Sequence, residues 1–451
     1  MIDNDAVFNN TTWILKKAIR LLRENPLCDN CLGRMFALLG RGWSNRERGD
    51  AIKRLIIMSI HRMIRESQEE GEKLLKEFAP NIGEQAKELY RIVFGQEINP
   101  KPCAICGSRL DSVIVELSRR AVEELRKCKV NTFLVAAHID DDIKRLEEHF
   151  RIEYGLQYAE SIGSELKREV SKVIQMQLGL KPDFNYPDVV IEIWFPLSHV
   201  SLRFQPLLLE GKYWKISRRV SQSIWITRRG VKRYSFSVEE ALLPLLELYD
   251  GTQLILHAAG REDVDVRMLG TGRPMVVEIK EAKRRDVDVK EAIDHINRWA
   301  KGLVNIELIG RSNRERVREI KGEKARHVKT YRALIVAIGD VDRDKLQKLE
   351  EYFNNITVRQ RTPRRVRHRR PDIVRERRVY SVKVRPVSSR VFEALIRCEG
   401  GLYVKELVDG DGGDTSPSFA EVVGEELYCA ELDVVAVEEI TVGKGRPNEG
   451  F

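Results

Sequence analysis

The sequence has no run of about eighteen uncharged apolar residues, so no segment is expected to cross a membrane as a helix. Its amino end also lacks the basic, apolar and small-residue order of a secretory signal peptide. The 451 residues include only 7 cysteines, which are too few and too unevenly spaced for a disulfide scaffold. These absences predict a cytoplasmic protein with no membrane partner. Because the cysteines do not fit a disulfide scaffold, metal binding is the next function to consider for them.

Positive charge exceeds negative charge along the chain. There are 78 lysine and arginine residues against 69 aspartate and glutamate residues, which gives a net charge of +9 and a pI near 9.1. This balance favours a polyanionic partner. With 451 residues, of which 42% are hydrophobic, the chain can bury at least two cores, so two main domains are expected.

Apolar residues recur at helical spacing in the first part of the chain, as at Ile14 to Leu22 and Ile52 to Ile60. Further along, short apolar runs such as Thr132 to Ala136 and Val189 to Phe195 alternate with helical stretches such as Ser161 to Gln177. This alternation of helical and strand patterns predicts an α+β fold that begins with helices.

Strands become frequent after about residue 212, so the expected domains are residues 1–212 and 213–451. Helices near Val238 to Leu248 and Val289 to Trp299 are expected between them. The expected strands are Ser223 to Thr227, Gln253 to Ala258, Met275 to Ile279, Leu334 to Ile338 and Val434 to Val437.

The segment from Arg359 to Arg378 is crowded with arginine, contains Pro363 and Pro371, and has few residues that could enter a core. It is predicted to be a solvated arm. A charged surface loop is one interpretation, and contact with phosphates is the favoured one. The candidate RNA-binding residues here are Arg364, Arg365, Arg367, Arg369 and Arg370.

Two Cys-x-x-Cys knuckles, Cys28 with Cys31 and Cys103 with Cys106, have the spacing that lets two thiolates reach one tetrahedral Zn²⁺ from a tight turn. Together they would form a four-cysteine site with no open coordination position, so the predicted zinc is structural and not catalytic. A redox dithiol or unrelated buried cysteines are the alternatives. The other three cysteines are interpreted as small core residues.

Three acidic residues, Glu262, Asp263 and Asp265, lie between an expected strand and a glycine turn. On spacing alone they could belong to a solvated turn. However, Gly260-Arg261-Glu262-Asp263 resembles the Gly-Arg-Thr-Asp and His-Arg-Leu-Asp signatures of pseudouridine synthases, whose last residue is the invariant aspartate. Asp263 takes that position.

Two further motifs follow in the order found in that superfamily. The string Lys329-Thr330-Tyr331-Arg332-Ala333-Leu334 resembles the second motif, whose tyrosine stacks against the target base, and Tyr331 takes that role. The stretch from Gly401 to Leu407 is similar to the third motif, Gly-Thr-Tyr-Ile-(Arg or Lys)-x-Leu, whose basic residue pairs with the aspartate. Lys405 is the match.

Over nearly its whole length, the chain resembles the archaeal and eukaryotic tRNA pseudouridine synthases that carry a two-knuckle zinc site and a THUMP RNA-binding domain. The strings Arg261 to Gly270, Gln360 to Pro363 and Ala159 to Ile162 carry this resemblance. It implies a THUMP module at about residues 80–205, followed by the pseudouridine synthase fold, a mixed antiparallel sheet flanked by helices. It also implies uridines 54 and 55 in the T loop of tRNA as substrates. One departure is Asp414, where the family usually has arginine.

The implied reaction cleaves the bond between ribose C1′ and the uracil nitrogen and joins C1′ to C5, without an organic cofactor. Ionised Asp263 would begin it by attacking the sugar or by removing a ribose proton. The base must be flipped out of the RNA, and Arg261 is the expected wedge. Tyr331 would hold the detached uracil above Leu432, and Lys405 would stabilise the charge of Asp263. The sequence indicates no obligatory protein partner.

Two other functions are compatible with parts of the sequence. A tRNA methyltransferase with a THUMP domain would need a glycine-rich loop after a strand, but Gly270-Thr271-Gly272 precedes Arg273-Pro274 and another strand and is predicted to be a hairpin turn. A non-catalytic tRNA-binding or chaperone protein would keep the zinc site, the THUMP module and the arginine segment. The presence of Asp263, Tyr331 and Lys405 favours the enzyme.

Overall fold

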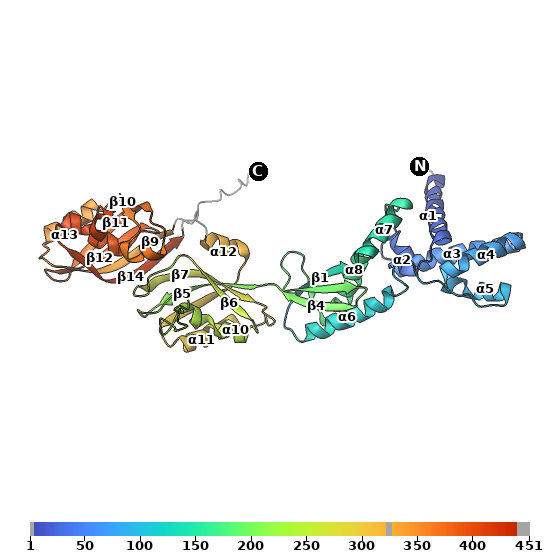
Figure 1. Cartoon of the computed structure of the whole chain (residues 1–451), viewed down its shortest axis with the longest axis horizontal. Helices are drawn as coiled ribbons and strands as arrows, with labels where there is room; N and C mark the ends of the chain where they lie inside the picture. The colour runs from blue at the N-terminus through green and yellow to red at the C-terminus, as the bar shows by residue number, and fades with distance from the viewer. Residues whose placement is uncertain (1–3, 322–326, 440–451) are drawn as a thin grey trace. The chain divides into compact units, whose positions relative to one another are not determined.

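The computed structural model of the protein describes residues 4–321 and 327–439 (Figure 1). The chain divides into two compact units, Met1–Gln205 and Pro206–Phe451. The division precedes the expected residue 212 because strand β5 (Leu207–Lys215) is hydrogen-bonded along its length into the sheet of the second unit. Every helix among the described residues is too short or too polar to span a bilayer.

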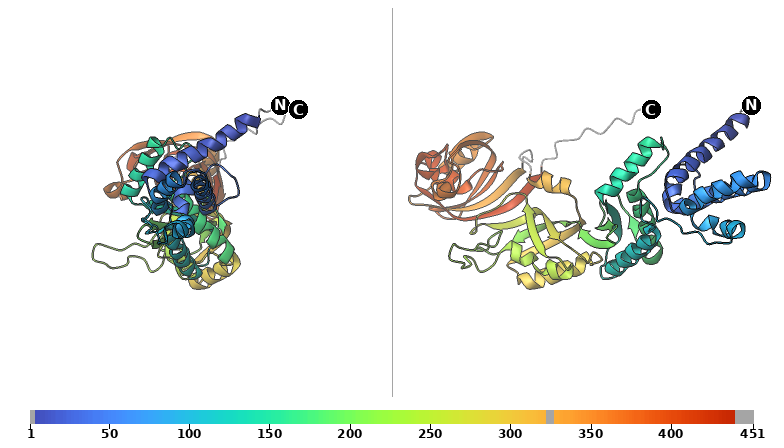
Figure 2. Two further views of the ribbon diagram at one scale, coloured as in Figure 1. Left: turned by 90° about the vertical axis from the view of Figure 1, so that its right-hand side faces the viewer. Right: turned by 45° about the vertical axis from the view of Figure 1, so that its right-hand side comes forward.

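The amino-terminal part of the first unit is helical, as the apolar spacing predicts. Its elements are α1 (Asn4–Glu24), α2 (Asp29–Arg34), α3 (Asn45–Glu66), α4 (Gln68–Ile82), the 3₁₀ turn η1 (Glu84–Ala86) and α5 (Lys87–Phe94). Ser44 begins α3 with a capping box, in which its hydroxyl accepts from the N–H of Glu47 and the Glu47 carboxylate accepts from the N–H of Ser44. Helix α1 projects from the others in Figure 2.

The rest of the first unit is a four-stranded sheet with helices packed against it. The strand order is β2-β1-β3-β4, with β1 parallel to β2 and β3, and β4 antiparallel to β3. The elements are α6 (Leu110–Arg126), β1 (Thr132–Ile139), α7 (Asp141–Glu153), α8 (Ile162–Leu178), β2 (Lys181–Pro182), β3 (Val189–Phe195) and β4 (His199–Phe204). The strands and helix expected in this region are confirmed.

The second unit is built on a ten-stranded sheet. Nine strands follow the order β13-β10-β11-β12-β9-β14-β7-β5-β8, and β6 pairs with β7 beside this path. Besides β5, the strands are β6 (Gln253–Ala258), β7 (Arg267–Lys280), β8 (Val304–Arg311), β9 (His327–Ala337), β10 (Ile356–Arg361), β11 (Val374–Pro386), β12 (Val391–Glu399), β13 (Thr415–Ser416) and β14 (Leu427–Glu439).

Short helices cover this sheet. They are α9 (Val238–Leu242), α10 (Pro244–Leu248), α11 (Val289–Ala300), α12 (Arg314–Lys321), α13 (Arg343–Tyr352), α14 (Val404–Asp409) and α15 (Phe419–Val423), with the 3₁₀ turns η2 (Arg364–Arg369) and η3 (Gly410–Gly413). The single helix expected at Val238 to Leu248 is divided at Pro244, which begins α10 because a proline has no N–H to donate to the preceding turn.

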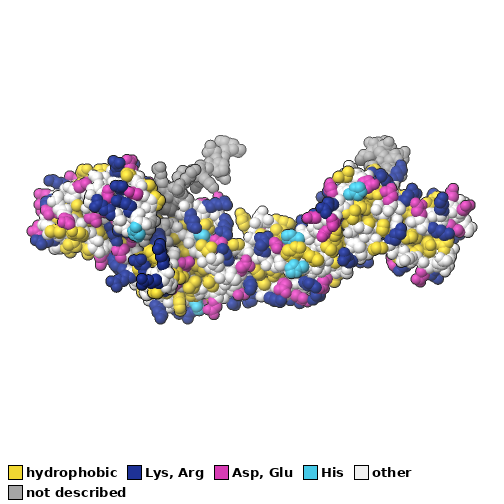
Figure 3. Space-filling view, viewed as in Figure 1, with side chains coloured by type: hydrophobic (Ala, Val, Ile, Leu, Met, Phe, Trp, Pro, Cys, Tyr) yellow, Lys and Arg dark blue, Asp and Glu magenta, His cyan; other side chains and the backbone are white. Residues whose placement is uncertain are grey.

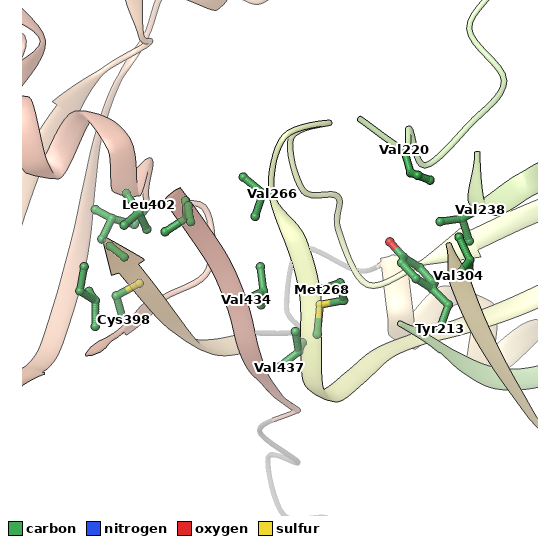
Figure 4. Packing of buried hydrophobic residues seen from close by; sticks show 14 of the residues in the cluster. Tyr213, Val220, Val238, Val266, Met268, Val304, Cys398, Leu402, Val434 and Val437 are labelled. Carbon is green, nitrogen blue, oxygen red and sulfur yellow. The ribbon is translucent and has the colours of Figure 1, made fainter. Parts of the chain in front are cut away.

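Strand β14 joins two halves of the sheet. It is antiparallel to β9 over most of its length, but its parallel pairing with β7 is limited to Asp433 with Arg267 and Val434 with Met268. Buried apolar side chains close this joint, and Figure 4 shows Val434 of β14 close to Met268 of β7. The chain segments at the joint therefore come from both halves of the sheet.

Two expectations for this unit are wrong. Ser223 to Thr227 is not a strand, since the only ladder contact there is an isolated bridge from Ile226 to Lys232 within a loop that leaves the sheet after β5 (Figure 2). Gly270-Thr271-Gly272 is not a hairpin turn but part of the continuous strand β7. Gly270 has a φ of +59°, and a Cβ there would lie 1.8 Å from the carbonyl oxygen of Val435, so glycine permits the close approach of β14.

The arginine-rich segment is more ordered than a solvated arm. Its first residues, to Arg361, end β10, and its last residues, from Val374, begin β11. Between them, Thr362 and Val366 are buried. The Thr362 hydroxyl donates to the carbonyl of Pro371 at 2.7 Å, which closes the segment at its base. The arginines are thus held on a short, anchored 3₁₀ turn.

Candidate active site

A cavity of about 240 Å³ opens in the second unit, where the two halves of the sheet meet. It is smaller than the roughly 300–1,000 Å³ of pockets for drug-sized ligands, so it suits one nucleobase better than a dinucleotide cofactor. The charged and aromatic residues of its lining are Arg261, Glu262, Asp263, Arg273, Lys329, Tyr331, Arg365, Arg370, Arg375, Tyr403 and Lys405. Lysine and arginine side chains also gather on the face of this unit seen in Figure 3.

Asp263 lies at this cavity with 40% of its side chain exposed, and its charge partner is Arg365. Arg365 Nη1 lies 2.8 Å from Asp263 Oδ2, and Arg365 Nε donates to Glu406 Oε1 at 2.7 Å. Burial disfavours the charge of Arg365, but its bonds to Glu406 and Asp263 raise its pKa above the ordinary value. Arg365 therefore bridges the exposed carboxylate of Asp263 and the buried carboxylate of Glu406.

Lys405 does not form the predicted pair with Asp263. Its Nζ donates instead to Asp265 Oδ2 at 2.5 Å. Burial acts to raise the pKa of Asp265, but the hydrogen bond and the charge of Lys405, with smaller contributions from the backbone and Arg365, together lower that pKa. Lys405 still lines the same cavity as Asp263, but the cation that pairs with Asp263 is Arg365 and not Lys405.

The backbone that carries Asp263 is fixed by a buried ion cluster. Lys215 Nζ donates to the carbonyl of Asp263 at 2.8 Å, and burial lowers the pKa of Lys215 to about 8. Glu262 faces Arg273 Nη2 at 2.9 Å and accepts from the Tyr213 hydroxyl at 3.0 Å. Burial opposes the charge of Glu262, yet Arg273 and Lys215 keep its pKa below the ordinary value. The position of the Asp263 backbone therefore depends on this cluster of buried charged residues.

Glu262→Gln should destabilise the second unit by about 3–5 kcal/mol, because it leaves Arg273 buried without its charge partner. Since the folded-state pKa of Glu262 is lowered, its stabilising contribution is present above its unfolded pKa and is lost as the pH falls through the folded value. Urea unfolding at neutral pH measures the loss. The control is Glu431→Gln, which removes an exposed ion pair to Arg218 and should cost less than about 1 kcal/mol. Equal stability of the two variants would contradict the role given to this cluster.

The structure brings Tyr331, Leu432 and Arg261 to the same cavity as Asp263. Tyr331 on β9 pairs with Val434 on β14, and Leu432 pairs with the neighbouring Ala333, so the two side chains come from adjacent strands. Burial raises the pKa of Tyr331. Leu432 is buried and Arg261 is exposed.

The five candidate arginines have different surroundings. Arg365 and Arg370 line the cavity, and Arg370 Nη1 donates to the Tyr403 hydroxyl at 3.3 Å. Arg364 Nε and Arg367 Nη2 instead donate to Asp414 Oδ2 at 2.9 and 2.8 Å. These bonds lower the pKa of Asp414, the position at which this chain departs from the family. The side chain of Arg369 lies outside the described part of the structure.

In the first unit, the Sγ atoms of Cys28, Cys31, Cys103 and Cys106 all lie within 4.8 Å of one another. Ligands in a tetrahedral zinc site with bonds of about 2.3 Å are about 3.8 Å apart, so the cluster has a suitable size. The neighbouring cysteines and burial raise the pKa of Cys31, and Arg34, whose Nη2 lies 3.5 Å from Cys31 Sγ, acts in the opposite direction. The four cysteines could therefore hold a metal ion that ties α2 to the segment before α6.

Sequence reasoning missed Lys329, Glu262, Arg273 and Arg365 as parts of this site. The sequence does indicate Lys329, since this residue precedes Tyr331 by two positions and so projects from the same face of a strand. Arg365 had been assigned to phosphate contacts alone. Glu262 and Arg273 had no clear signal, because a charge within an acidic cluster, such as Glu262, and a charge between glycine and proline, such as Arg273, are both typical of surface turns.

Comparison with known proteins gives matches to both units. The family described as "Pus10, C-terminal" matches residues 208–438, and "Pus10 THUMP domain, archaeal" matches residues 117–193. A tRNA pseudouridine synthase Pus10 of Aeropyrum pernix is 45% identical over 427 residues, which are 94% of this chain and 97% of that protein. The protein of the same name from Ignisphaera aggregans is 41% identical over 430 residues, which are 94% of this chain and 99% of that protein.

Proposed function

Because the chain belongs to the Pus10 family of tRNA pseudouridine synthases, we propose that it isomerises uridines 54 and 55 in the T loop of tRNA, with Asp263 as the catalytic carboxylate. The family makes it an RNA-modifying isomerase with a THUMP domain in its first unit. Residues 206–451 would perform the reaction, and residues 1–205 would bind the tRNA. The single observation that best supports Asp263 is that it shares one base-sized cavity with Tyr331 and Leu432.

The reaction breaks the C1′–N1 bond, forms a C1′–C5 bond and moves one proton from C5 to N1. Neither oxidation nor reduction occurs, so the chemistry calls for no redox cofactor. Asp263 would start it by attacking C1′ or by removing a ribose proton, and either route needs an ionised and accessible carboxylate. Its partial exposure makes the carboxylate accessible, and Arg365, 2.8 Å from Oδ2, orients it as a charged partner.

Holding the detached base is the second requirement, because uracil must turn without leaving the enzyme. Tyr331 would provide the stacking face and Leu432 the apolar floor. Arg261, which is exposed at the cavity, would fill the vacancy left in the RNA when the uridine is flipped out. The remaining basic residues would contact the RNA phosphates or orient the side chains that contact them. They are Arg364, Arg365, Arg367, Arg369, Arg370 and Lys405.

Tyr331→Ala should slow pseudouridine formation by about 5- to 150-fold, since stacking of a base on an aromatic ring is worth about 1–3 kcal/mol. Tyr331→Phe should keep most of the rate if stacking is the main contribution. Single-turnover rates on unmodified tRNA transcript test both. Tyr428→Ala, which removes an exposed tyrosine of β14, is the control and should behave as wild type. Equal loss in Tyr331→Phe and Tyr331→Ala would assign the role to the hydroxyl instead.

The cysteine cluster would hold a structural Zn²⁺. Four thiolates fill the tetrahedral shell, and such a closed site supplies folding free energy and no reaction step. The group of four sulfur donors within 4.8 Å, with Arg34 beside Cys31, supports this assignment.

The test of the proposed function is pseudouridine formation by the purified protein on unmodified tRNA transcript, mapped by carbodiimide-dependent primer extension. Transcripts with cytidine at position 54 or at position 55 would report each site separately. Product at both positions is the expected result. Tight binding without product in any transcript would favour the non-catalytic tRNA-binding or chaperone protein.

A further inference from the structure

Lys329 is a buried cation of the cavity to which the reaction described above gives no role. It lies on β9 two residues before Tyr331, its side chain lines the cavity, and it is only 8% exposed. Among the described residues, neither a carboxylate nor a carbonyl oxygen binds its Nζ. A buried ammonium without a partner is costly, so its presence beside Tyr331 requires an explanation.

The other charges around Lys329 are already paired. Glu262 is the nearby buried carboxylate, and it is bound by Arg273, with Lys215 at 3.7 Å. Arg273 also donates to the carbonyl of Ala259 at 2.7 Å. On the other side, Lys329 is paired across the sheet with Cys398 of β12, whose pKa burial raises to about 12 and which is therefore a neutral thiol. Burial and the nearby Arg273 lower the pKa of Lys329 to about 8, so it remains mostly charged at neutral pH.

The Nζ atom of Lys329 lies against the loop that carries Asp263. A Cβ placed on Gly260 would lie 3.1 Å from Lys329 Nζ, so the ammonium lies against the backbone three residues before Asp263. Its strand position puts it on the same face of β9 as Tyr331. A base held on the ring of Tyr331 therefore lies close to this ammonium.

We propose that Lys329 donates a hydrogen bond to a carbonyl oxygen of the uracil while the base is detached from ribose, and that its charge balances the negative charge on the base. This inference rests on the proposed function. When the C1′–N1 bond breaks, its electron pair stays with the base, where N1 and the carbonyl oxygens share the charge. The same electrons later form the C1′–C5 bond, after which C5 loses its proton and N1 gains one. Lys329 keeps its own proton throughout.

Lys329 suits this role better than Arg365 and Lys405, which line the same cavity. Arg365 is bound by Asp263 and Glu406, and Lys405 is bound by Asp265. A cation that is already neutralised has less capacity to stabilise a new negative charge. A fixed donor in a dry site interacts strongly with charge that develops during the reaction, and removing one such donor typically costs about 10²- to 10³-fold in rate.

Lys329→Met, which keeps the length and apolar stem of the side chain, is the direct test. Its single-turnover rate on tRNA transcript at pH 7 should fall by about 10²- to 10³-fold, while its affinity for tRNA stays within about threefold of wild type. Its thermal unfolding midpoint should be equal to that of wild type or higher, because a buried unpaired charge has been removed. The control is Lys383→Met, which removes an exposed lysine paired with Glu350 and should leave the rate unchanged.

The pH dependence separates this role from a merely structural one. At subsaturating enzyme, the wild-type rate should fall as the pH rises through about 8, where Lys329 loses its charge, and Lys329→Met should show a smaller decrease. Arg273, Glu262, Cys398 and Tyr331 face Lys329, and none of them titrates near pH 8. Lys215 does, at about 8, and because it is retained in the variant its contribution is the same in both proteins; the part of the decrease that is present in wild type and absent from Lys329→Met belongs to Lys329.

Each outcome is decisive. An inactive wild-type protein would refute the proposed function itself. An active wild type with Lys329→Met at full rate would refute this inference alone. A slow Lys329→Met whose decrease near pH 8 is as large as that of wild type, or that unfolds at lower temperature, would assign Lys329 a structural role. Lys329→Gln, which keeps a donor without the charge, is the second variant; it should show the same reduced pH-dependent decrease as Lys329→Met and retain a rate between those of Lys329→Met and wild type.

Discussion

Asp263→Asn should reduce the rate of pseudouridine formation at least about a thousandfold, because an amide can neither attack C1′ nor accept a ribose proton. The substitution keeps the shape of the side chain and an oxygen that can accept from Arg365. Arg365 also keeps its bond to Glu406, so the cavity should retain its structure. Affinity for tRNA should be equal to wild type or higher, since one negative charge has been removed from an RNA-binding surface.

The neighbouring Asp265 provides the matched comparison. Asp265→Asn removes the ion pair with Lys405, in which Asp265 is mostly exposed, and should lower the rate by no more than about fivefold. Both variants are measured in single turnover on the same transcript, with binding followed separately. If Asp265→Asn lost all activity while Asp263→Asn retained it, the catalytic carboxylate would have to be reassigned to Asp265.

Replacement of Cys28 and Cys31 together by serine should remove bound zinc and strongly destabilise the first unit. Structural zinc in finger peptides contributes an apparent free energy of about 10–16 kcal/mol, which is comparable to the entire stability of a typical domain, about 5–15 kcal/mol. The four cysteines also pack within the apolar core of this unit, so loss of the ion would leave sulfur and oxygen atoms buried without ligands. Unfolding of residues 1–205 at lower temperature is the expected result.

Metal analysis of the purified proteins and limited proteolysis measure these two effects. Wild type should hold about one zinc per chain, and its helical part should resist cleavage. Cys128→Ser, which changes a cysteine outside the cluster, should keep both properties. A double variant that still bound a full equivalent of zinc would rule out the cysteine cluster as the metal site.

The parts of the structure that could be predicted have a local signal. Apolar spacing is enough for α8 and for β1 and β3, because the period of the pattern follows from the geometry of each element. The motifs around Asp263, Tyr331 and Leu432 could be recognised one at a time, and the cavity they share follows from the family fold. The strand expected at Ser223 to Thr227 failed because β-forming residues need a partner strand, and that loop has none beyond a single bridge.

The partners of charged residues could not be predicted in the same way. Lys405 and Arg365 can both reach the acidic loop, and the choice between Asp263 and Asp265 depends on where η2 is anchored after folding. Likewise, Glu262 and Arg273 look like surface charges in the sequence but are almost completely buried. Long ionic side chains have several possible partners, so only three-dimensional packing selects one.

The place of β14 in the sheet sets when the enzyme can become active during its own synthesis. Among the described strands β14 is made last, yet it lies between β9 and β7 and supplies Leu432 and Val434 to the cavity. Until residues 427–439 have left the ribosome, the two halves of the sheet have facing edges without a partner, and such edges promote association with other chains. A chain that lacks β14 should therefore hold tRNA through its finished first unit without modifying it, and activity should begin only once β14 has been made.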